Sequence, residues 1–296
     1  AWACVTGKPV SKGGISGRTE ATGRGVQYAL QAFFDQKRDV AKTGLKPGLA
    51  NKRIIVQGLG NVGYHAALFL STEDKAIITH VLERDGSVID EDGINIQKLR
   101  EHILDTGSVK GYQGFVAKGI ELLEADADIL IPAAMELVIT EENASSIKAP
   151  LIIEAANGPV SAEADDILNK MSKVIIPDMY ANAGGVTVSY FEWIKNLSRI
   201  RFGRMQRRAE ENRFGALIEG INTLTGADFP EDLAKKIIQG GKEIDLVRSG
   251  LEDTMRNAYE IISETWNAHD EVKDLRTAAM MVAIKRIAQS YSSMGI

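Results

Sequence analysis

The sequence predicts an α/β protein: a doubly wound, mostly parallel Rossmann-type sheet followed by a helical C-terminal region. Three observations carry this prediction. A glycine motif stands between a strand pattern and a helix pattern, short apolar runs alternate with helical stretches, and the pattern becomes helical from about Val188 onward. Short strands that alternate with helices are typical of βαβ units, in which neighbouring strands run parallel.

The glycine motif follows the β-branched run Arg53–Gln57 and reads Gly58-Leu-Gly60-Asn-Val-Gly63. In such a G-x-G-x-x-G loop the first glycine makes the tight turn, and the second lets the backbone approach a pyrophosphate. The third lets the helix pack closely on the strand, and the helix pattern Tyr64–Leu70 offers its N-terminal N–H groups to phosphates. We therefore predict dinucleotide binding, with a glycine-rich turn of purely structural role as the alternative.

Glu83 stands twenty positions after Gly63, at the end of the apolar run Ala76–Leu82. An acidic residue at this place accepts hydrogen bonds from the hydroxyls of an adenosine ribose. Its carboxylate repels the 2′-phosphate of NADP, although Arg84 directly after it partly offsets that charge. We expect NAD as the cofactor, with NADP as a second option.

The other elements are expected from periodicity and turn residues. Residues 1–17 are expected to form a loop, about Thr19 to Asp39 a helix, and Lys46–Gly48 a turn. Further along, the expected elements are a turn at 85–87, helices at 96–104, 162–171, 190–197, 207–224, 245–268 and 275–291, and strands at 128–132, 151–154 and 173–177, while 111–117 is ambiguous. The expected domains are a connecting loop and helix (1–45), a dinucleotide-binding Rossmann domain (46–190) and C-terminal helices (191–296).

Residues that directly follow the predicted strands are the candidates for ligand contacts. In open parallel sheets, ligands bind at the carboxyl ends of the strands, near the point where the strand order reverses. This rule selects residues 58–62, Glu83, Ala133, Ala134, 155–159 and 178–186. Asn157 and Asn182 offer amide groups after two of these strands, although Asn-Gly and Ala-Gly-Gly sequences also make ordinary turns.

Composition excludes several classes of function. The net charge of −5 and the pI of about 5.6 argue against nucleic acid or an acidic membrane as partner. Cys4 is the only cysteine, so a reducing compartment is expected, and no apolar run has the length of a membrane span. The four histidines are scattered, and we predict no metal site. The chain begins with Ala1, so we expect that it is processed or cut from a longer protein.

Several longer strings of residues resemble the cofactor-binding half of a glutamate dehydrogenase, of the family that also contains leucine, phenylalanine and valine dehydrogenases. The strings are residues 13–18, 21–25, 57–63, 131–134, 154–159, 182–193 and 274–279. The block Asn182–Trp193 is especially specific, because no general property of the fold requires that string.

The resemblance implies a role for each matching residue. The implied cofactor-binding residues are Arg18, Thr22, Gln57, Gly58, Gly60, Asn61, Val62, Gly63, Glu83, Ala133, Ala134, Asn157 and Asn182. Of these, Arg18 and Thr22 face the nicotinamide region, and the two asparagines bond the nicotinamide-side ribose and amide. Val186 and Ser189 are implied to reach the amino-acid substrate, Ser189 giving a hydroxyl to its side-chain carboxylate.

The implied activity is reversible NAD(P)-dependent oxidative deamination of L-glutamate to 2-oxoglutarate and ammonia. The family's catalytic lysine and aspartate lie in an N-terminal substrate domain that no stretch of this chain resembles, and Lys8 and Lys12 in a flexible polar loop are poor substitutes. We therefore expect no catalytic residue in this chain, and an inactive fragment. The complete protein is expected to be a homo-hexamer, cytoplasmic or alternatively in the mitochondrial matrix.

Two alternatives stay open. A branched-chain or aromatic amino-acid dehydrogenase shares the architecture, but an apolar pocket gains nothing from the buried hydroxyl of Ser189. A stand-alone NAD-binding regulatory module would bind the cofactor without turnover.

The arginine-rich segment from Arg199 to about Arg248 has two interpretations: a solvated helical hairpin, or a shorter form of the antenna of animal-type glutamate dehydrogenases. This chain departs from the animal-type GTP site. Ser16 and Arg248 replace its histidines, and Leu68 and Thr72 replace its arginines. Because lost arginines mean lost phosphate pairing, we expect no inhibition by GTP.

Overall fold

The computed structural model describes residues 2–198, 204–238 and 242–295, which divide into two compact units. The sheet unit comprises Glu20–Val186 and Glu252–Ile296, and the helical unit comprises Ala1–Thr19 and Thr187–Leu251. The boundaries of these two units differ from those of the domains expected from the sequence (1–45, 46–190 and 191–296). The three-domain division remains a prediction.

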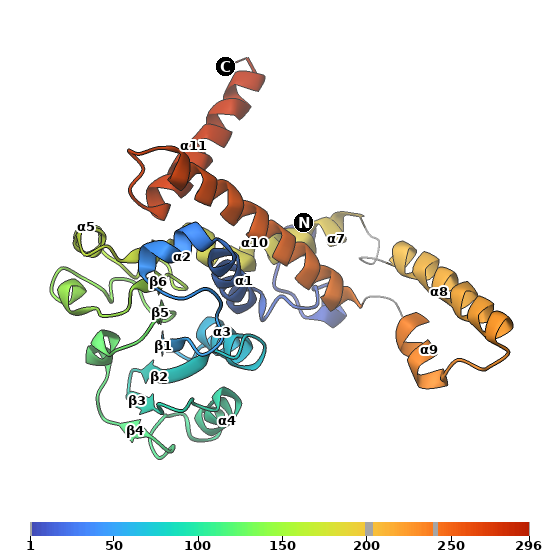
Figure 1. Ribbon diagram of the computed structural model, residues 1–296, viewed down its shortest axis with the longest axis horizontal. Helices are drawn as coiled ribbons and strands as arrows, with labels where there is room; N and C mark the ends of the chain where they lie inside the picture. The colour runs from blue at the N-terminus through green and yellow to red at the C-terminus, as the bar shows by residue number, and fades with distance from the viewer. Residues whose placement is uncertain (1, 199–203, 239–241, 296) are drawn as a thin grey trace. The chain divides into compact units, whose positions relative to one another are not determined.

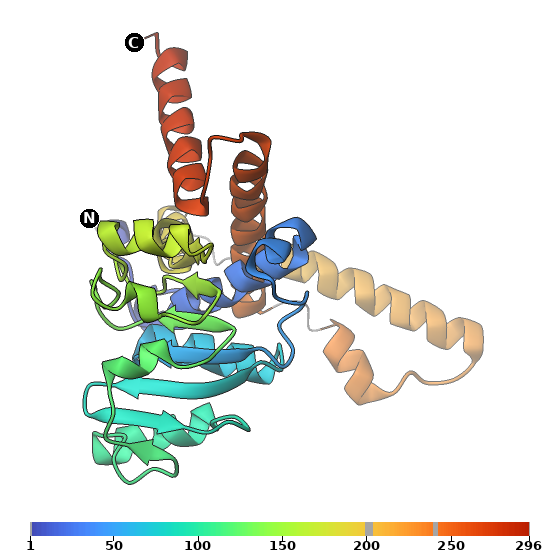
Figure 2. The same cartoon turned by 60° about the vertical axis from the view of Figure 1, so that its left-hand side comes forward.

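The sheet unit is built around a sheet of seven strands among the described residues, in the order β4-β3-β2-β1-β5-β6-β7. Figure 1 labels the strands of this order from β4 to β6, and Figure 2 shows the same sheet after a turn of 60°. The strands are β1 (Arg53–Gln57), β2 (Ile77–Glu83), β3 (Gly86–Ile89), β4 (Phe115–Val116), β5 (Ile129–Pro132), β6 (Leu151–Ile153) and β7 (Val174–Ile176). Strands β2, β1, β5, β6 and β7 run parallel, and β3 and β4 are antiparallel additions. The predicted doubly wound, mostly parallel sheet is confirmed.

The strand order reverses between β1 and β5, because the chain leaves β1 toward β2 and later returns to pair β5 on its other side. Residues Ile54, Ile55 and Val56 of β1 are fully buried. Strands that are covered on both faces need apolar residues throughout, which explains why these runs were recognisable from sequence.

One sequence expectation at the sheet edge is wrong. Gly86 and Ser87 were expected in a turn, but they begin β3, and only Arg84 and Asp85 turn the chain. Gly86 permits this hairpin because a Cβ there would lie 2.4 Å from the ring of Phe115 on β4. Strand β3 pairs with β2 over Gly86–Ile89, and four residues are too few to show a periodic pattern.

Helices complete the sheet unit. They are α1 (Ala21–Asp35), α2 (Lys37–Thr43), α3 (Asn61–Thr72), α4 (Ile96–Thr106), α5 (Ala162–Lys170), α6 (Asp178–Ala181) and α11 (Leu275–Ser293). The single helix expected from Thr19 to Asp39 is instead two helices that break at Gln36. The break lets the buried carboxylate of Asp39 accept hydrogen bonds from Tyr259 and Ser263, at 2.8 and 2.6 Å.

Glycines of α1 allow it to pack closely on two neighbours. A Cβ at Gly23 would lie 2.6 Å from Cβ of His65 on α3, and one at Gly25 would lie 2.9 Å from Cα of Gly184. Helix α1 therefore lies against α3, which follows the glycine loop, and against the residues that follow Asn182. This brings the first turn of α1 to the carboxyl edge of the sheet.

The helical unit contains two short 3₁₀ turns, η1 (Trp2–Cys4) and η2 (Val10–Lys12), with α8 (Arg204–Thr225) and α9 (Glu231–Ile238). Most of α7 (Gly184–Ser198) and the start of α10 (Glu243–Ala268) also belong to it. Helix α7 begins six residues earlier than expected, and α9 was not expected. The antenna-like range 199–248 falls partly on 199–203 and 239–241, which lie outside the described residues, including Arg199 and Arg201. None of the described helices has the length and apolar character needed to cross a bilayer.

Lys8 lies in a loop, as expected, but its side chain is buried against α7. The ammonium group of Lys8 lies 2.8 Å from the carboxylate of Glu192, and their side chains are 6% and 0% exposed. The backbone N–H of Gly7 donates to the same carboxylate at 2.8 Å, and Asn196 donates to the carbonyl of Gly13 at 3.0 Å. Burial alone would raise the pKa of Glu192, but Lys8 and the backbone donors hold it below its usual value. Helix α7 thus holds the N-terminal loop in place.

Candidate functional site

The three glycines of the motif differ in what surrounds them. Gly58 has a φ of +86°, and a Cβ there would lie 2.6 Å from that of Ala134. A Cβ at Gly63 would lie 1.9 Å from the carbonyl oxygen of Gly58. A Cβ at Gly60 would have no atom within 4 Å. The loop is therefore closed at its first and third glycines and open at the second, as approach of a pyrophosphate requires.

Glu83 lies at this loop. The backbone N–H of Leu59 donates a hydrogen bond to the Glu83 carboxylate, and the N–H of Gly58 donates to the carbonyl of Leu82 at 2.7 Å. The end of β2 therefore places an acidic group directly beside the glycine loop. Such an arrangement fits an adenosine ribose with both hydroxyls free.

Arg100 was not identified from the sequence. This residue of α4 donates from Nη1 to the carbonyl oxygen of Leu59 at 2.8 Å, and its guanidinium lies 5.5 Å from the ring centre of Tyr64. The loop residue Leu59 is thus bonded to a carboxylate through its N–H and to a guanidinium through its C=O. No local pattern signals this role, because Arg100 is an ordinary residue of an amphipathic helix.

The remaining predicted residues of the glycine loop occupy the end of β1 and the start of α3. Gln57 is the last residue of β1, and its Oε1 is buried with no hydrogen-bond partner among the described residues. Asn61, Val62 and Gly63 form the first turn of α3, where a helix presents the positive end of its dipole. An anionic group beside this turn would be stabilised by that dipole.

Ala133 and Ala134 follow β5 on the other side of the strand reversal. The N–H of Ala133 donates to the carbonyl of Gln57 at 2.8 Å, which holds these residues against the end of β1. Their small side chains leave room at Gly58, where a Cβ would already collide with Ala134. The structure thus brings both alanines to the glycine loop.

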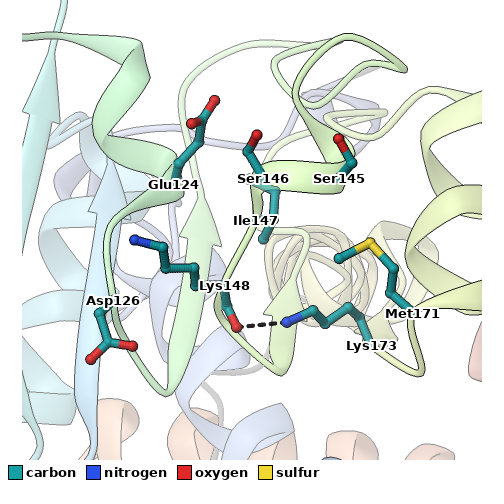
Figure 3. Close-up of a pocket in the computed structure, with 8 residues that line it drawn as sticks. All are labelled: Glu124, Asp126, Ser145, Ser146, Ile147, Lys148, Met171 and Lys173. Carbon is teal, nitrogen blue, oxygen red and sulfur yellow. Dashed lines mark hydrogen bonds between the residues drawn. The ribbon is translucent and has the colours of Figure 1, made fainter.

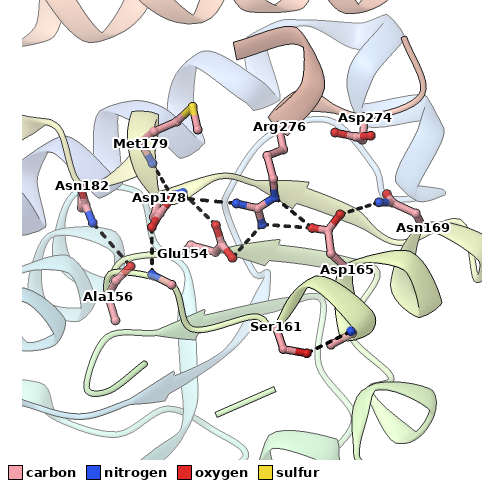
Figure 4. A network of polar contacts seen from close by, with 12 residues as sticks. Glu154, Ala156, Ser161, Asp165, Asn169, Asp178, Met179, Asn182, Asp274 and Arg276 are labelled. Atoms are coloured by element: carbon pink, nitrogen blue, oxygen red, sulfur yellow. Dashed lines mark hydrogen bonds and ion pairs between the residues drawn. The ribbon is translucent and has the colours of Figure 1, made fainter. Parts of the chain in front are cut away.

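The two predicted asparagines meet. Asn182 donates from Nδ2 to Oδ1 of Asn157 at 2.7 Å, and it lies 3.4 Å from the carbonyl oxygen of Ala156. Figure 4 shows Asn182 pointing toward Ala156 across the ends of β6 and β7. The amide side chains that sequence reasoning placed after two separate strands therefore form one polar cluster at the carboxyl edge.

The last four predicted residues fall in different units. In the sheet unit, Thr22 is half-buried in the first turn of α1 and Val186 is exposed. In the helical unit, Arg18 donates from Nε to Oγ of Ser189 at 2.8 Å, across 171 positions of sequence. The structure thus joins Arg18, which the resemblance places at the nicotinamide, to Ser189, which the resemblance places at the substrate.

A separate pocket of about 640 Å³ lies at the opposite edge of the sheet (Figure 3). Its lining includes Asp126, Lys148 and Lys173, which precede β5, β6 and β7. Lys173 donates to the carbonyl of Lys148 at 2.6 Å, and burial lowers the pKa of its ammonium group. None of the predicted site residues lines this pocket. Within the described ranges, no group of three or more His, Cys, Asp and Glu residues could hold a metal ion.

Comparisons with known proteins show the family of this chain. A family model described as Glutamate/Leucine/Phenylalanine/Valine dehydrogenase matches residues 13–217. The chain belongs to this family. The resemblance inferred from the motif strings is thereby confirmed, and membership implies a nicotinamide dinucleotide, NAD or NADP, as cofactor.

Relatives within the dehydrogenase family match nearly the whole chain. It is 48% identical to a probable glutamate dehydrogenase from Sinorhizobium fredii, over 97% of this chain and 65% of that protein. It is 47% identical to a mitochondrial glutamate dehydrogenase from Dictyostelium discoideum, over 99% of this chain and 58% of that protein. The chain thus spans about three fifths of the length of these curated relatives.

A solved structure confirms the fold. The hetero-hexameric glutamate dehydrogenase from Thermus thermophilus, in a leucine-bound form, superposes with a TM-score of 0.72 at 23% identity. The superposition covers 99% of this chain and 57% of that one. At this identity the likeness establishes the architecture of the dehydrogenase and nothing finer.

Proposed function

We propose that this chain is the dinucleotide-binding part of an NAD-dependent glutamate dehydrogenase. One observation carries the proposal: the glycine loop is sterically closed at Gly58 and Gly63, open at Gly60, and bonded to the carboxylate of Glu83. A structural turn has no need of an open second glycine, whereas a bound pyrophosphate does.

Most of the predicted cofactor-binding residues then have a position relative to the cofactor. The glycine loop and the first turn of α3 hold the pyrophosphate, and Glu83 holds the adenosine ribose. Ala133 and Ala134 line the cofactor, while Thr22, Asn157 and Asn182 hold its nicotinamide half. The bound nicotinamide supplies hydride transfer to or from the substrate carbon. The residues of this chain bind and orient that group.

The contact between Arg18 and Ser189 supports an acidic substrate. A guanidinium and a hydroxyl at 2.8 Å from each other offer several donors, which match the two oxygens of a carboxylate. Leucine or phenylalanine would offer no acceptor to the remaining N–H donors of the Arg18 guanidinium. We therefore place Ser189 and Arg18 at the side-chain carboxylate of L-glutamate, with Val186 nearby in sequence on the same helix.

The proposed reaction is the reversible oxidative deamination of L-glutamate to 2-oxoglutarate and ammonia. The lysine and aspartate that the family resemblance implies for this chemistry are not assigned to any residue of this chain. Lys8 is unsuited to the role, because it is committed to an ion pair with the buried Glu192. For the complete enzyme we propose a homo-hexamer, in the cytoplasm or alternatively in the mitochondrial matrix.

We propose that the described part of the range 199–248, residues 204–238 and 242–248, belongs to a shortened antenna-like insertion. In its described part, α8 and α9 pack against each other as a helical pair. We also propose that GTP does not inhibit the complete enzyme, because Leu68 and Thr72 carry no positive charge that could form an ion pair with a phosphate. Micromolar inhibition of the complete enzyme by GTP would contradict it.

Isothermal titration calorimetry tests the cofactor proposal. NADH should bind to the chain, and NADPH should bind more weakly. A well-folded sample that takes up neither nucleotide would refute the proposed function. Assays of the complete protein with glutamate and with leucine then decide the substrate, because turnover of leucine alone would favour the branched-chain alternative.

A further inference from the structure

Arg276 lies in the first turn of α11 and contacts three carboxylates of the sheet unit (Figure 4). Its Nη2 is 2.8 Å from Oε1 of Glu154, its Nε is 3.0 Å from Oδ1 of Asp165, and its Nη1 is 3.8 Å from Oδ1 of Asp178. The side chain of Asp274 caps α11 by accepting from the N–H of Thr277 at 2.7 Å. The cap defines where the helix begins and so where the guanidinium stands.

The first of these carboxylates belongs to a fully buried residue that joins two strand ends. Glu154 directly follows β6, and its Oε2 accepts a hydrogen bond from the N–H of Asp178 at 2.8 Å. Asp178 directly follows β7 and Pro177, and its Oδ2 accepts from the N–H of Gly158 at 2.8 Å. Two hydrogen bonds therefore connect the loop after β6 to α6, and Arg276 contacts Glu154, the acceptor of the first of them.

The two asparagines proposed to contact the nicotinamide half lie next to these hydrogen bonds. Asn157 directly precedes Gly158, and the N–H of Asn182 donates to the carbonyl of Asp178 at 3.1 Å. The two asparagines then meet at 2.7 Å. Because the backbone N–H groups of Gly158 and Asn182 both donate to Asp178, a displacement of Asp178 would disturb the contact between the asparagines.

Charge makes the arrangement depend on Arg276. Burial raises the pKa of Glu154, and the Arg276 guanidinium opposes that rise. Without the guanidinium, a buried carboxylate would face the like charges of Asp165 on α5 and Asp178 on α6. Glu154 would then either take up a proton or move toward water, and movement would break its bond to Asp178.

We infer that Arg276 is a positioning residue: through Glu154 and Asp178 it holds Asn157 and Asn182 in place for the nicotinamide half of the cofactor. This inference rests on the proposed function. The competing explanation is that Arg276 only anchors α11 to the sheet unit. If Arg276 positions the asparagines, its loss should weaken binding of the nicotinamide half and spare binding at the glycine loop. If Arg276 only anchors α11, its loss should change binding at both places equally or at neither.

ADP separates the two explanations, because it carries the adenosine and the diphosphate but no nicotinamide. The test measures dissociation constants of NADH and ADP by calorimetry at pH 8 for the wild-type chain, Arg276→Gln and the control Arg286→Gln. Arg286 is an exposed arginine on the same helix. Thermal unfolding of each variant reports stability independently of binding.

The inference predicts that Arg276→Gln weakens NADH binding at least tenfold and changes ADP binding less than twofold. Arg286→Gln should change neither. Equal affinity of Arg276→Gln and wild type for NADH would overturn the inference, and so would parallel weakening of NADH and ADP. Wild-type chain that binds no NADH would instead overturn the proposed function, and the inference with it.

A second variant covers the case in which Arg276→Gln does not fold. The double variant Glu154→Gln with Arg276→Gln removes the unpaired buried charge and keeps an acceptor for the N–H of Asp178. It should fold and should bind NADH within about threefold of wild type. A folded double variant that binds ADP normally but has lost NADH binding tenfold or more would overturn the route through Glu154.

Discussion

Asn182 donates a hydrogen bond to Asn157 at 2.7 Å, which joins the loops that follow β6 and β7. Each asparagine follows a different strand, so the pair exists only because parallel strands end at one edge of the sheet. An amide carries two N–H donors and an acceptor oxygen. The pair therefore keeps further donors and acceptors for a ligand at that edge.

Asn182→Ala should weaken NADH binding about tenfold and leave ADP binding unchanged. The variant loses both a ligand contact and the bond that orients Asn157, and one net hydrogen bond is worth about 1 kcal/mol. Calorimetry with both nucleotides measures the effect. Equal weakening of ADP binding would show that the pair supports the whole site rather than its nicotinamide half.

Gly60→Ala should weaken cofactor binding without loss of stability, whereas Gly63→Ala should lower stability. Gly60 has an ordinary φ of −67° and open space at its Cβ, so alanine should leave the melting temperature unchanged and weaken NADH binding at least tenfold. An added Cβ at Gly63 would lie 1.9 Å from the carbonyl of Gly58, so alanine should cost about 2 kcal/mol of stability. Thermal unfolding without ligand separates the two. Normal NADH binding by Gly60→Ala would contradict the proposed location of the pyrophosphate.

Glu83→Gln should shift the nucleotide preference toward NADP. Glutamine keeps an acceptor for the N–H of Leu59 but removes the charge that repels a 2′-phosphate. At a solvent-facing distance of about 4 Å this repulsion is worth about 1 kcal/mol, so NADPH should bind about fivefold more tightly. Binding of NADH should weaken a few-fold. An unchanged ratio of the two dissociation constants would place the 2′-position away from Glu83.

His80 should make stability fall in mild acid. This residue of β2 is buried, its Nδ1 lies 2.9 Å from Oγ1 of Thr79, and desolvation lowers its pKa. The pKa of His80 in the folded state is below the unfolded value of about 6.5. The contribution of neutral His80 to stability is therefore complete above about pH 6.5, and it is lost as the pH falls from there through the folded-state pKa. The slope is at most about 1.4 kcal/mol per pH unit. Urea unfolding at pH 7.5 and 5.5 should show a smaller loss for His80→Gln than for wild type. Parallel losses would exclude His80 as the cause.

Lys8→Met should destabilise the helical unit by about 3 kcal/mol, because it leaves the buried carboxylate of Glu192 without its cation. Lys12→Met is a matched control, since Lys12 is exposed. The lowered pKa of Glu192 means that the ion pair stabilises the fold above about pH 4.5 and that this contribution is lost as pH falls below it. Chemical unfolding at pH 7 and 4 measures both effects. Equal stability of the two variants at pH 7 would contradict the importance of the ion pair.

Local patterns were sufficient for the parallel strands and for the glycine loop. Strands β1, β2, β5, β6 and β7 are buried along most of their length, and strands covered on both faces require largely apolar sequences. Three more features could be read from the sequence: the glycine spacing, the position of Glu83 after the second strand, and the positions of the asparagines after the last two strands. Each of these depends on neighbours within a few residues or on the rule that parallel strands end together.

The other features depend on contacts between residues far apart in the chain. The break at Gln36 is accompanied by bonds between Asp39 and α10, more than 200 positions away. The bond of Arg18 to Ser189, the ion pair of Lys8 with Glu192, and the approach of Arg276 to Glu154 likewise join distant segments. A charged residue looks the same in sequence whether it is solvated or buried against a partner. Only the folded chain brings the partner close, and a charged side chain is buried only where such a partner offsets the cost of removing it from water.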